Sequence, residues 1–159
     1  MKRLTQKLLL QGVDELAMAD KALGRVVERY GPPPMWGRKP GFAALVKIIL
    51  EQQVSLSSAE AVFLRLQSVI PEVSAEHILA LSADGLRELG FTRQKANYCE
   101  GLAKSVRSGE INLEHLNKMN DEDAHNTLLK QKGIGPWTAN VYLLMALKRP
   151  DIWPDGDLA

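Results

Sequence analysis

Apolar residues recur three and four positions apart along most of the chain, which is the period of an amphipathic α-helix. The pattern is visible in three sets: Phe42, Leu45, Val46, Ile49 and Leu50; Ala59, Val62, Phe63 and Leu66; and Tyr98, Leu102 and Val106. Alternation with a period of two is confined to residues 110–114, a stretch too short and too isolated to make a sheet. The sequence therefore predicts an all-α fold.

Capping and turn-forming residues divide this pattern into short helices. A Ser, Thr or Asn before a helical run favours a helix start, and a Gly or Pro after it favours an end. The expected starts are Ser57 (with Glu60 three positions later), Thr92 and Asn120, and the expected ends are Pro71, Gly90 and Gly109. We expect a helix or helix pair over about 4–30, a linker rich in Gly and Pro, and a series of short helices over 41–148.

The chain is expected to divide into two parts. Residues 1–35 are an N-terminal helical segment with a Pro-rich linker, and residues 36–159 are a helical domain. Within the domain we expect two helices joined by a tight turn over 128–147 and a loop over 150–159. Residues 138–147 are apolar on nearly every face, which predicts a helix buried at the centre of the domain.

Composition narrows the class of protein further. A chain of 159 residues, 45% hydrophobic and 25% charged, is typical of one folded soluble domain. No apolar run approaches the ~18 residues of a membrane-spanning helix, and the start has no secretory signal, so we expect a cytoplasmic protein. Twenty Lys and Arg against nineteen Asp and Glu give a net charge of +1. Binding to nucleic acid would therefore need a local basic patch or backbone amides.

The cysteine and histidine residues argue against several cofactors. The single cysteine, Cys99, excludes an internal disulfide, a four-thiolate iron–sulfur cluster and a Cys-rich zinc site. The three histidines, His77, His115 and His125, show no spacing typical of metal ligands, and we expect them on the surface.

The segment from Leu128 to Ala139 holds the strongest candidate for a binding site. Its Gly-Ile-Gly turn lets the backbone reverse sharply, with the Ile in the core, and leaves N–H groups at a helix N-terminus for an anion such as phosphate. The expected phosphate-binding residues are Gly133, Gly135 and Thr138, with Lys132 and Lys130 adding charge. Carbonyls on the other side of the turn can hold Na⁺ or K⁺, and the expected ligands are those of Leu129, Gln131 and Gly133. The alternative is a simple turn between two helices.

Four blocks of the chain resemble the helix-hairpin-helix (HhH-GPD) DNA glycosylases, in particular the branch typified by 3-methyladenine DNA glycosylase II. The blocks are residues 42–58, 89–103, 128–147 and 149–159, in the family's order and spacing. The resemblance implies a monomeric, monofunctional enzyme of base excision repair without a redox cofactor. Such an enzyme flips an alkylated purine, of the 3-methyladenine type, out of duplex DNA and hydrolyses its glycosidic bond.

The resemblance also implies a catalytic aspartate in the loop after the hairpin, where both Asp155 and Asp157 lie. Asp157 is followed by Leu158 and Ala159, which matches the family pattern, so we expect Asp157 to be catalytic and Asp155 to be a turn residue. A carboxylate near the anomeric carbon stabilises an oxocarbenium-like sugar. From the residues alone, the alternative for Asp157 is a helix N-cap.

Trp137 stands two residues after the second hairpin glycine, where strand-cleaving members carry a lysine that forms a Schiff base. The resemblance therefore implies no strand cleavage and places Trp137 in the base pocket, where its ring attracts a cationic purine. Packing in the core is the alternative. Val141 stands where the family often has a second aromatic residue, so the pocket is expected to be less aromatic than usual.

Gln53 aligns with the family's wedge, the side chain that fills the gap left by the flipped nucleotide. The alternative is a pair of solvent-facing glutamines, Gln52 and Gln53. Trp36 is expected to anchor the linker, and a place in the pocket wall is its alternative. Arg93 and Lys95 either contact phosphate or form a solvated helix turn.

In the family, further helices follow the catalytic loop and pack on the N-terminal segment, so the chain looks truncated at its C-terminus. The apolar face of residues 4–30 is then expected to lack its usual partner. A second functional hypothesis is consequently a non-catalytic or truncated helix-hairpin-helix module that binds DNA. A third is a strand-cleaving glycosylase for oxidised bases, against which Trp137 argues. The expected location is a bacterial nucleoid or a eukaryotic nucleus.

Overall fold

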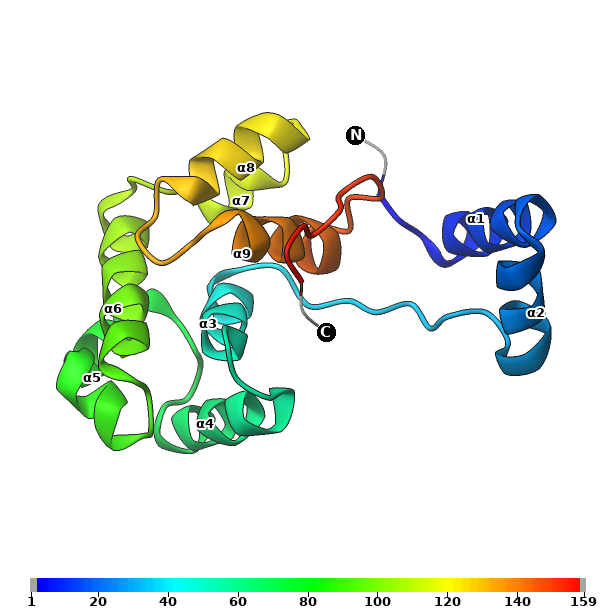
Figure 1. Ribbon diagram of the computed structural model, residues 1–159. Helices are drawn as coiled ribbons and strands as arrows, with labels where there is room; N and C mark the ends of the chain where they lie inside the picture. Colours follow the sequence, from blue (N-terminus) through cyan, green and yellow to red (C-terminus); the bar gives the residue numbers. More distant parts are fainter. Residues whose placement is uncertain (1–2, 158–159) are drawn as a thin grey trace.

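The structure, a computed structural model, describes residues 3–157, and within that range the chain forms helices and no strand (Figure 1). The elements are α1 (Gln6–Ala19), α2 (Lys21–Tyr30), α3 (Phe42–Glu51), α4 (Leu56–Val69), α5 (Ala75–Glu88), α6 (Arg93–Ser108), α7 (Leu113–Leu116), α8 (Asp121–Leu129), α9 (Pro136–Val141) and the π-helix η1 (Tyr142–Ala146). The all-α prediction is confirmed, and the segment near residues 4–30 is a helix pair.

Helix α3 lies at the centre of the domain because its side chains are apolar on most faces. Leu45, Val46, Ile48 and Ile49 are all fully buried. The helix contacts α4 and α6 on the one hand and α9 and η1 on the other, so it joins the helices before the hairpin to those after it. The second central helix is α9 with η1, in which Tyr142 and Leu143 are also fully buried. The prediction of a buried helix over 138–147 is confirmed; this helix begins at Pro136 and widens into a π-helix from Tyr142.

Side-chain caps fix several helix boundaries. Thr92 and Asn120 accept hydrogen bonds from the backbone N–H groups of Lys95 and Asp123, as expected of N-caps. The expected start at Ser57 is wrong. Ser55 is the N-cap of α4 because its backbone is extended and its hydroxyl accepts from the N–H of Ser58, whereas Ser57 already lies inside the helix.

Glycine ends two helices in the expected places, and Pro71 follows a third. Gly109 is the C-cap of α6 with φ +78°, and Gly90 follows the C-cap of α5 with φ +98°. Both values lie in the left-handed region that glycine adopts without strain. Helix α4 ends at Val69, two residues before Pro71.

The N-terminal helices α1 and α2 pack on each other and lie apart from the other helices in Figure 1. Asp20 joins them, since its carboxylate accepts from the N–H groups of Ala22 and Leu23 at the start of α2. Several large apolar side chains of the pair are exposed: Leu16, Met18, Val26 and Tyr30. The pair therefore has the uncovered apolar surface expected from the sequence.

The linker between α2 and α3 is held by backbone hydrogen bonds and one ion pair. The N–H of Arg38 donates to the carbonyl of Met145 over 2.9 Å, and its guanidinium lies 2.8 Å from the carboxylate of Glu51. Trp36 is 68% exposed, so the expectation that its ring anchors the linker is wrong. The backbone holds the linker instead, because the N–H of Arg38 supplies a donor to one of the carbonyls at the end of η1.

Two leucines of α4 test which face of this helix is buried in the core. Leu66 is fully buried and Leu64 is 55% exposed. We expect Leu66→Ala to lower the free energy of unfolding by about 2–5 kcal/mol, because it leaves a cavity. Leu64→Ala should lower it by less than about 1 kcal/mol. Urea unfolding followed by circular dichroism measures both, and equal losses would contradict this placement of α4.

Candidate functional site

The turn between α8 and α9 has the geometry that its two glycines predict. The side chain of Ile134 is buried between them, and its N–H donates to the carbonyl of Gln131 over 3.0 Å. Gly133 has φ +90°, and a Cβ built on it would overlap the ring of Tyr98 in α6. This position therefore needs glycine both for its backbone conformation and for space.

Helix α9 begins without a side-chain cap. Gly135 is its N-cap, Pro136 is its first residue, and the first hydrogen bond of the helix runs from the N–H of Ala139 to the carbonyl of Gly135. The N–H groups of Trp137 and Thr138 precede that bond and point out of the helix end. These amides and the exposed Lys132 form the basic, donor-rich end expected of an anion site.

The side chain of Thr138 does not face that end. It is 2% exposed, and its hydroxyl oxygen accepts a hydrogen bond from Nε2 of Gln52 over 2.9 Å. Of the predicted phosphate ligands, Gly133, Gly135 and Lys132 thus lie together at the turn, whereas Thr138 offers only its backbone N–H. Their binding of phosphate stays a prediction.

The two glutamines after α3 have different surroundings. Gln52 is half-buried, and its Nε2 donates to the carbonyl of Gly133 and to Thr138 Oγ1, both over 2.9 Å. Gln53 is exposed in the turn between α3 and α4 and has φ +56°. A solvent-facing pair is therefore wrong for Gln52. The exposure of Gln53 agrees with either interpretation of that residue, so its role as a wedge stays a prediction.

Lys95 holds the C-terminal end of α3. Its Nζ donates to the carbonyls of Leu50 and Gln52 over 2.6 and 2.8 Å. Burial lowers the pKa of Lys95 from its usual value, and the neighbouring Cys99 partly opposes this shift. The expectation of a solvated helix turn is wrong for Lys95, because the carbonyls left open at the end of α3 attract its ammonium group. A phosphate contact of Lys95 stays a prediction. Arg93 is exposed.

Trp137 is half-buried and packs against the hydrophobic core, which leaves part of its side chain accessible. Three residues further along α9, the side-chain amide of Asn140 donates to the carbonyl of Trp153 over 3.1 Å. This bond attaches the loop after η1 to the helix that carries Trp137. Asn140 was missed in the sequence because its partner is a backbone atom.

The loop over 150–157 ends at the predicted catalytic residue. Asp155 lies in a turn, as expected, and the N–H of Asp157 donates to the carbonyl of Pro154 over 3.2 Å. Asp157 is exposed. Leu158 and Ala159, which complete the expected loop, lie outside the described residues. The catalytic role of Asp157 stays a prediction.

Arg149 fixes the start of this loop from inside the domain. It is 2% exposed, its Nη2 donates to the carbonyls of Asn117 and Met119, and its Nε lies 3.3 Å from Oδ1 of Asp121. The carbonyls belong to the segment between α7 and α8, so Arg149 ties the end of the central helix to that segment. An arginine before a proline carries no periodic signal, and sequence reasoning missed it.

Two of the three expected cation ligands already accept one hydrogen bond each, and the binding of a cation stays a prediction. The carbonyls of Gln131 and Gly133 already accept hydrogen bonds from Ile134 N–H and Gln52 Nε2, which leaves each oxygen a second lone pair. Among the residues that the structure describes, no group of three or more His, Cys, Asp or Glu side chains is placed to hold a metal ion. Within the same range, no helix is both long and apolar enough to span a bilayer.

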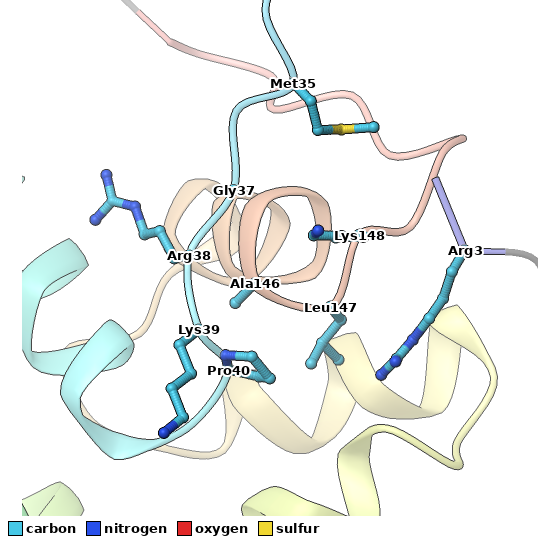
Figure 2. A pocket seen from close by; sticks show the side chains of 9 residues that line it. All are labelled: Arg3, Met35, Gly37, Arg38, Lys39, Pro40, Ala146, Leu147 and Lys148. Atoms are coloured by element: carbon cyan, nitrogen blue, oxygen red, sulfur yellow. The ribbon is translucent and has the colours of Figure 1, made fainter. Parts of the chain in front are cut away.

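A basic cavity of about 490 Å³ lies between the linker and the end of η1 (Figure 2). It is lined by Arg3, Met35, Gly37, Arg38, Lys39, Pro40, Ala146, Leu147 and Lys148. Arg38 and Lys39 come from the linker, Lys148 from the segment after η1, and Arg3 from the N-terminal end. None of the predicted site residues lines it. Four of its nine lining residues are Arg or Lys, and one of them, Arg38, is paired with Glu51.

Comparison with known sequences identifies one family and several relatives. The family model described as "HhH-GPD superfamily base excision DNA repair protein" matches residues 46–158. A Bacillus subtilis protein named DNA-3-methyladenine glycosylase is 31% identical over 156 residues, which cover 91% of this chain and 52% of that protein. A Schizosaccharomyces pombe protein named DNA-3-methyladenine glycosylase 1 is 29% identical over 154 residues, covering 94% of this chain and 66% of that protein. The chain spans about half the length of the Bacillus relatives that it matches.

Solved structures share the fold. A 3-methyladenine DNA glycosylase of S. pombe, in complex with abasic DNA, superposes with a TM-score of 0.83 at 26% identity, covering 93% of this chain and 75% of that one. A 3-methyladenine DNA glycosylase from Archaeoglobus fulgidus gives a TM-score of 0.76 at 28% identity, covering 93% and 54%.

The two glycines of the hairpin provide a matched test of its geometry. We expect Gly133→Ala to destabilise the protein by roughly 1–3 kcal/mol or more, because the new methyl group overlaps Tyr98 and needs a left-handed φ. Gly135→Ala should be tolerated, since φ is −91° and no atom lies within 4 Å of its Cβ. Thermal unfolding of both variants measures the difference, and an equally stable Gly133→Ala would show that the hairpin is formed differently.

Proposed function

Because the chain belongs to the HhH-GPD superfamily of base excision DNA repair proteins, we propose that it is a monofunctional DNA glycosylase that releases alkylated purines of the 3-methyladenine type from duplex DNA. The observation that carries the proposal is the arrangement around α9. Helix α9 begins at the hairpin without a side-chain cap, and Trp137 is its second residue. Asn140, in the same helix, holds the loop that leads to Asp157. The names of the two glycosylase relatives support the choice of substrate.

In this proposal Asp157 is the catalytic residue. Cleavage of the glycosidic bond gives the sugar oxocarbenium character, which a carboxylate beside the anomeric carbon stabilises while it orients the attacking water. An alkylated purine already carries a positive charge while it is attached to the sugar and takes the bonding electrons to leave as a neutral base, so no second acid is required. Trp137 would stack on the flipped base, because its electron-rich face attracts the positive charge.

The hairpin would hold the DNA backbone, and a side chain from the turn between α3 and α4 would insert between the bases. The backbone N–H groups at Gly133, Gly135 and Thr138, with Lys132, would bind a phosphate, and Gln53 would fill the space left by the flipped nucleotide. Na⁺ or K⁺ held by the carbonyls of Leu129, Gln131 and Gly133 would bridge to the same phosphate. The enzyme would act as a monomer on chromosomal DNA, in a bacterial nucleoid or a eukaryotic nucleus.

A second candidate function is that of a non-catalytic module that binds DNA through the hairpin. The observation that favours it is the exposure of Asp157 near the end of the described loop. A carboxylate stabilises a developing positive charge most strongly where bulk water is excluded. Base release distinguishes the two functions, since both predict binding to DNA.

Base release from methylated duplex DNA tests the proposed reaction. We expect this chain to release 3-methyladenine and leave an abasic site. Asp157→Asn should slow release by about 100-fold or more while duplex binding is retained, because only transition-state charge stabilisation is lost. Asp155→Asn removes the same charge two residues away and should keep most of the activity. If Asp157→Asn released base at the rate of the unmodified chain, Asp157 would not be the catalytic residue.

Borohydride treatment tests the absence of strand cleavage. A Schiff base between a lysine and the sugar is reduced to a stable protein–DNA adduct, whereas hydrolysis by water forms no covalent bond to the protein that reduction could make permanent. With Trp137 at the lysine position, we expect no adduct by gel electrophoresis and no cut strand. A lysine-dependent glycosylase run in parallel is the positive control, and a trapped complex with this chain would contradict the monofunctional assignment.

A further inference from the structure

We propose that Gln52 is a positioning residue that locks the hairpin to the turn between α3 and α4, so that these two elements meet DNA as one rigid unit. The inference rests on the proposed function only in assigning DNA as the ligand of the two elements. The contact itself is a property of the free protein.

The side-chain amide of Gln52 connects the two sides of the hairpin turn. Its Nε2 donates to the carbonyl of Gly133, the first glycine, and to Oγ1 of Thr138, in the first turn of α9. An amide NH₂ has two hydrogens, and each has an acceptor at 2.9 Å. Inside the turn only the N–H of Ile134 is shown to donate to a backbone carbonyl, so the side chain of Gln52, the C-cap of α3, adds rigidity that the turn does not supply itself.

The backbone of the same residue is held by Lys95. The carbonyl of Gln52 accepts from Nζ of Lys95, which also binds the carbonyl of Leu50. The next residue, Gln53, has φ +56°, a conformation that costs energy in any residue with a Cβ and persists only where its surroundings enforce it. Lys95 from α6 and the hairpin together supply those surroundings.

The contacts of Gln52 fix the distance between the hairpin and Gln53. Under the proposed function, the hairpin binds a phosphate and Gln53 enters the base stack, and flipping needs both at once. If the link is broken, each element still binds on its own, but their relative position is no longer set. A loss of preorganisation of this kind lowers the rate of reaction more than it lowers affinity for undamaged DNA.

Two variants of Gln52 remove the link by different chemistry. Gln52→Glu keeps the size of the side chain but replaces the donating NH₂ by a carboxylate oxygen, which repels the carbonyl of Gly133. Gln52→Met keeps the length without a charge. Gln67→Glu is the matched control, because Gln67 is exposed on α4 and the same change of charge there touches neither element.

Amide hydrogen exchange of the free protein is the first measurement. We expect residues 132–138 to exchange roughly five- to ten-fold faster in both Gln52 variants than in the unmodified chain, with α6 unchanged. Gln67→Glu should match the unmodified chain throughout. Unchanged exchange of the hairpin would overturn the proposal. So would a uniform increase over the whole domain, which is the mark of general destabilisation.

Single-turnover base release and binding to undamaged duplex are the second measurement. We expect both Gln52 variants to release base roughly ten- to a hundred-fold more slowly, with duplex affinity within about two-fold of the unmodified chain. Equal losses of rate and affinity would overturn the positioning role. If the unmodified chain releases no base, the proposed function fails, and the exchange measurement still decides whether Gln52 couples the two elements.

Discussion

A turn that keeps its backbone N–H groups open for a ligand cannot use them to hold itself together. The hairpin meets this constraint with groups from elsewhere in the chain: the amide of Gln52 binds both sides of the turn, and the ring of Tyr98 lies where a side chain on Gly133 would be. Ile134 fixes the turn to the core from below. Helix α3 is central because its side chains are apolar on most faces, and this position brings its C-terminal end to α6 and the hairpin at once.

The distribution of charge follows from the same architecture. The chain carries almost equal numbers of acidic and basic residues, so the attraction for an anion is local. One basic region is the hairpin end with Lys132, and another is the cavity formed by the linker and the segment after η1. Each depends on segments distant in the sequence, and the backbone contact between Arg38 and Met145 brings the linker to its side of the cavity.

The sequence predicts those features that depend on local pattern. The helices, the caps at Thr92 and Asn120, the left-handed glycine at position 109 and the buried helix after the hairpin all depend on residues within a few positions of one another. The predicted N-cap of α4, Ser57, lies two residues after the observed one, Ser55, because three nearby serines offer the same cap chemistry. The roles of Gln52, Lys95 and Arg149 could not be predicted, since each binds backbone carbonyls of segments distant in the chain, and carbonyls leave no mark on a sequence. Trp36 was expected to anchor the linker, but the contact that does so is made by the backbone N–H of Arg38.

The single thiol of the chain lies in α6 beneath this network, fully buried, and burial raises its pKa to about 12. Only a thiolate reacts readily with electrophiles, and at neutral pH almost none of Cys99 is in that form. Reagents that methylate DNA bases also methylate accessible thiolates. Burial therefore protects the one thiol of the chain from such reagents, and alkylation of Cys99 would require the domain to open.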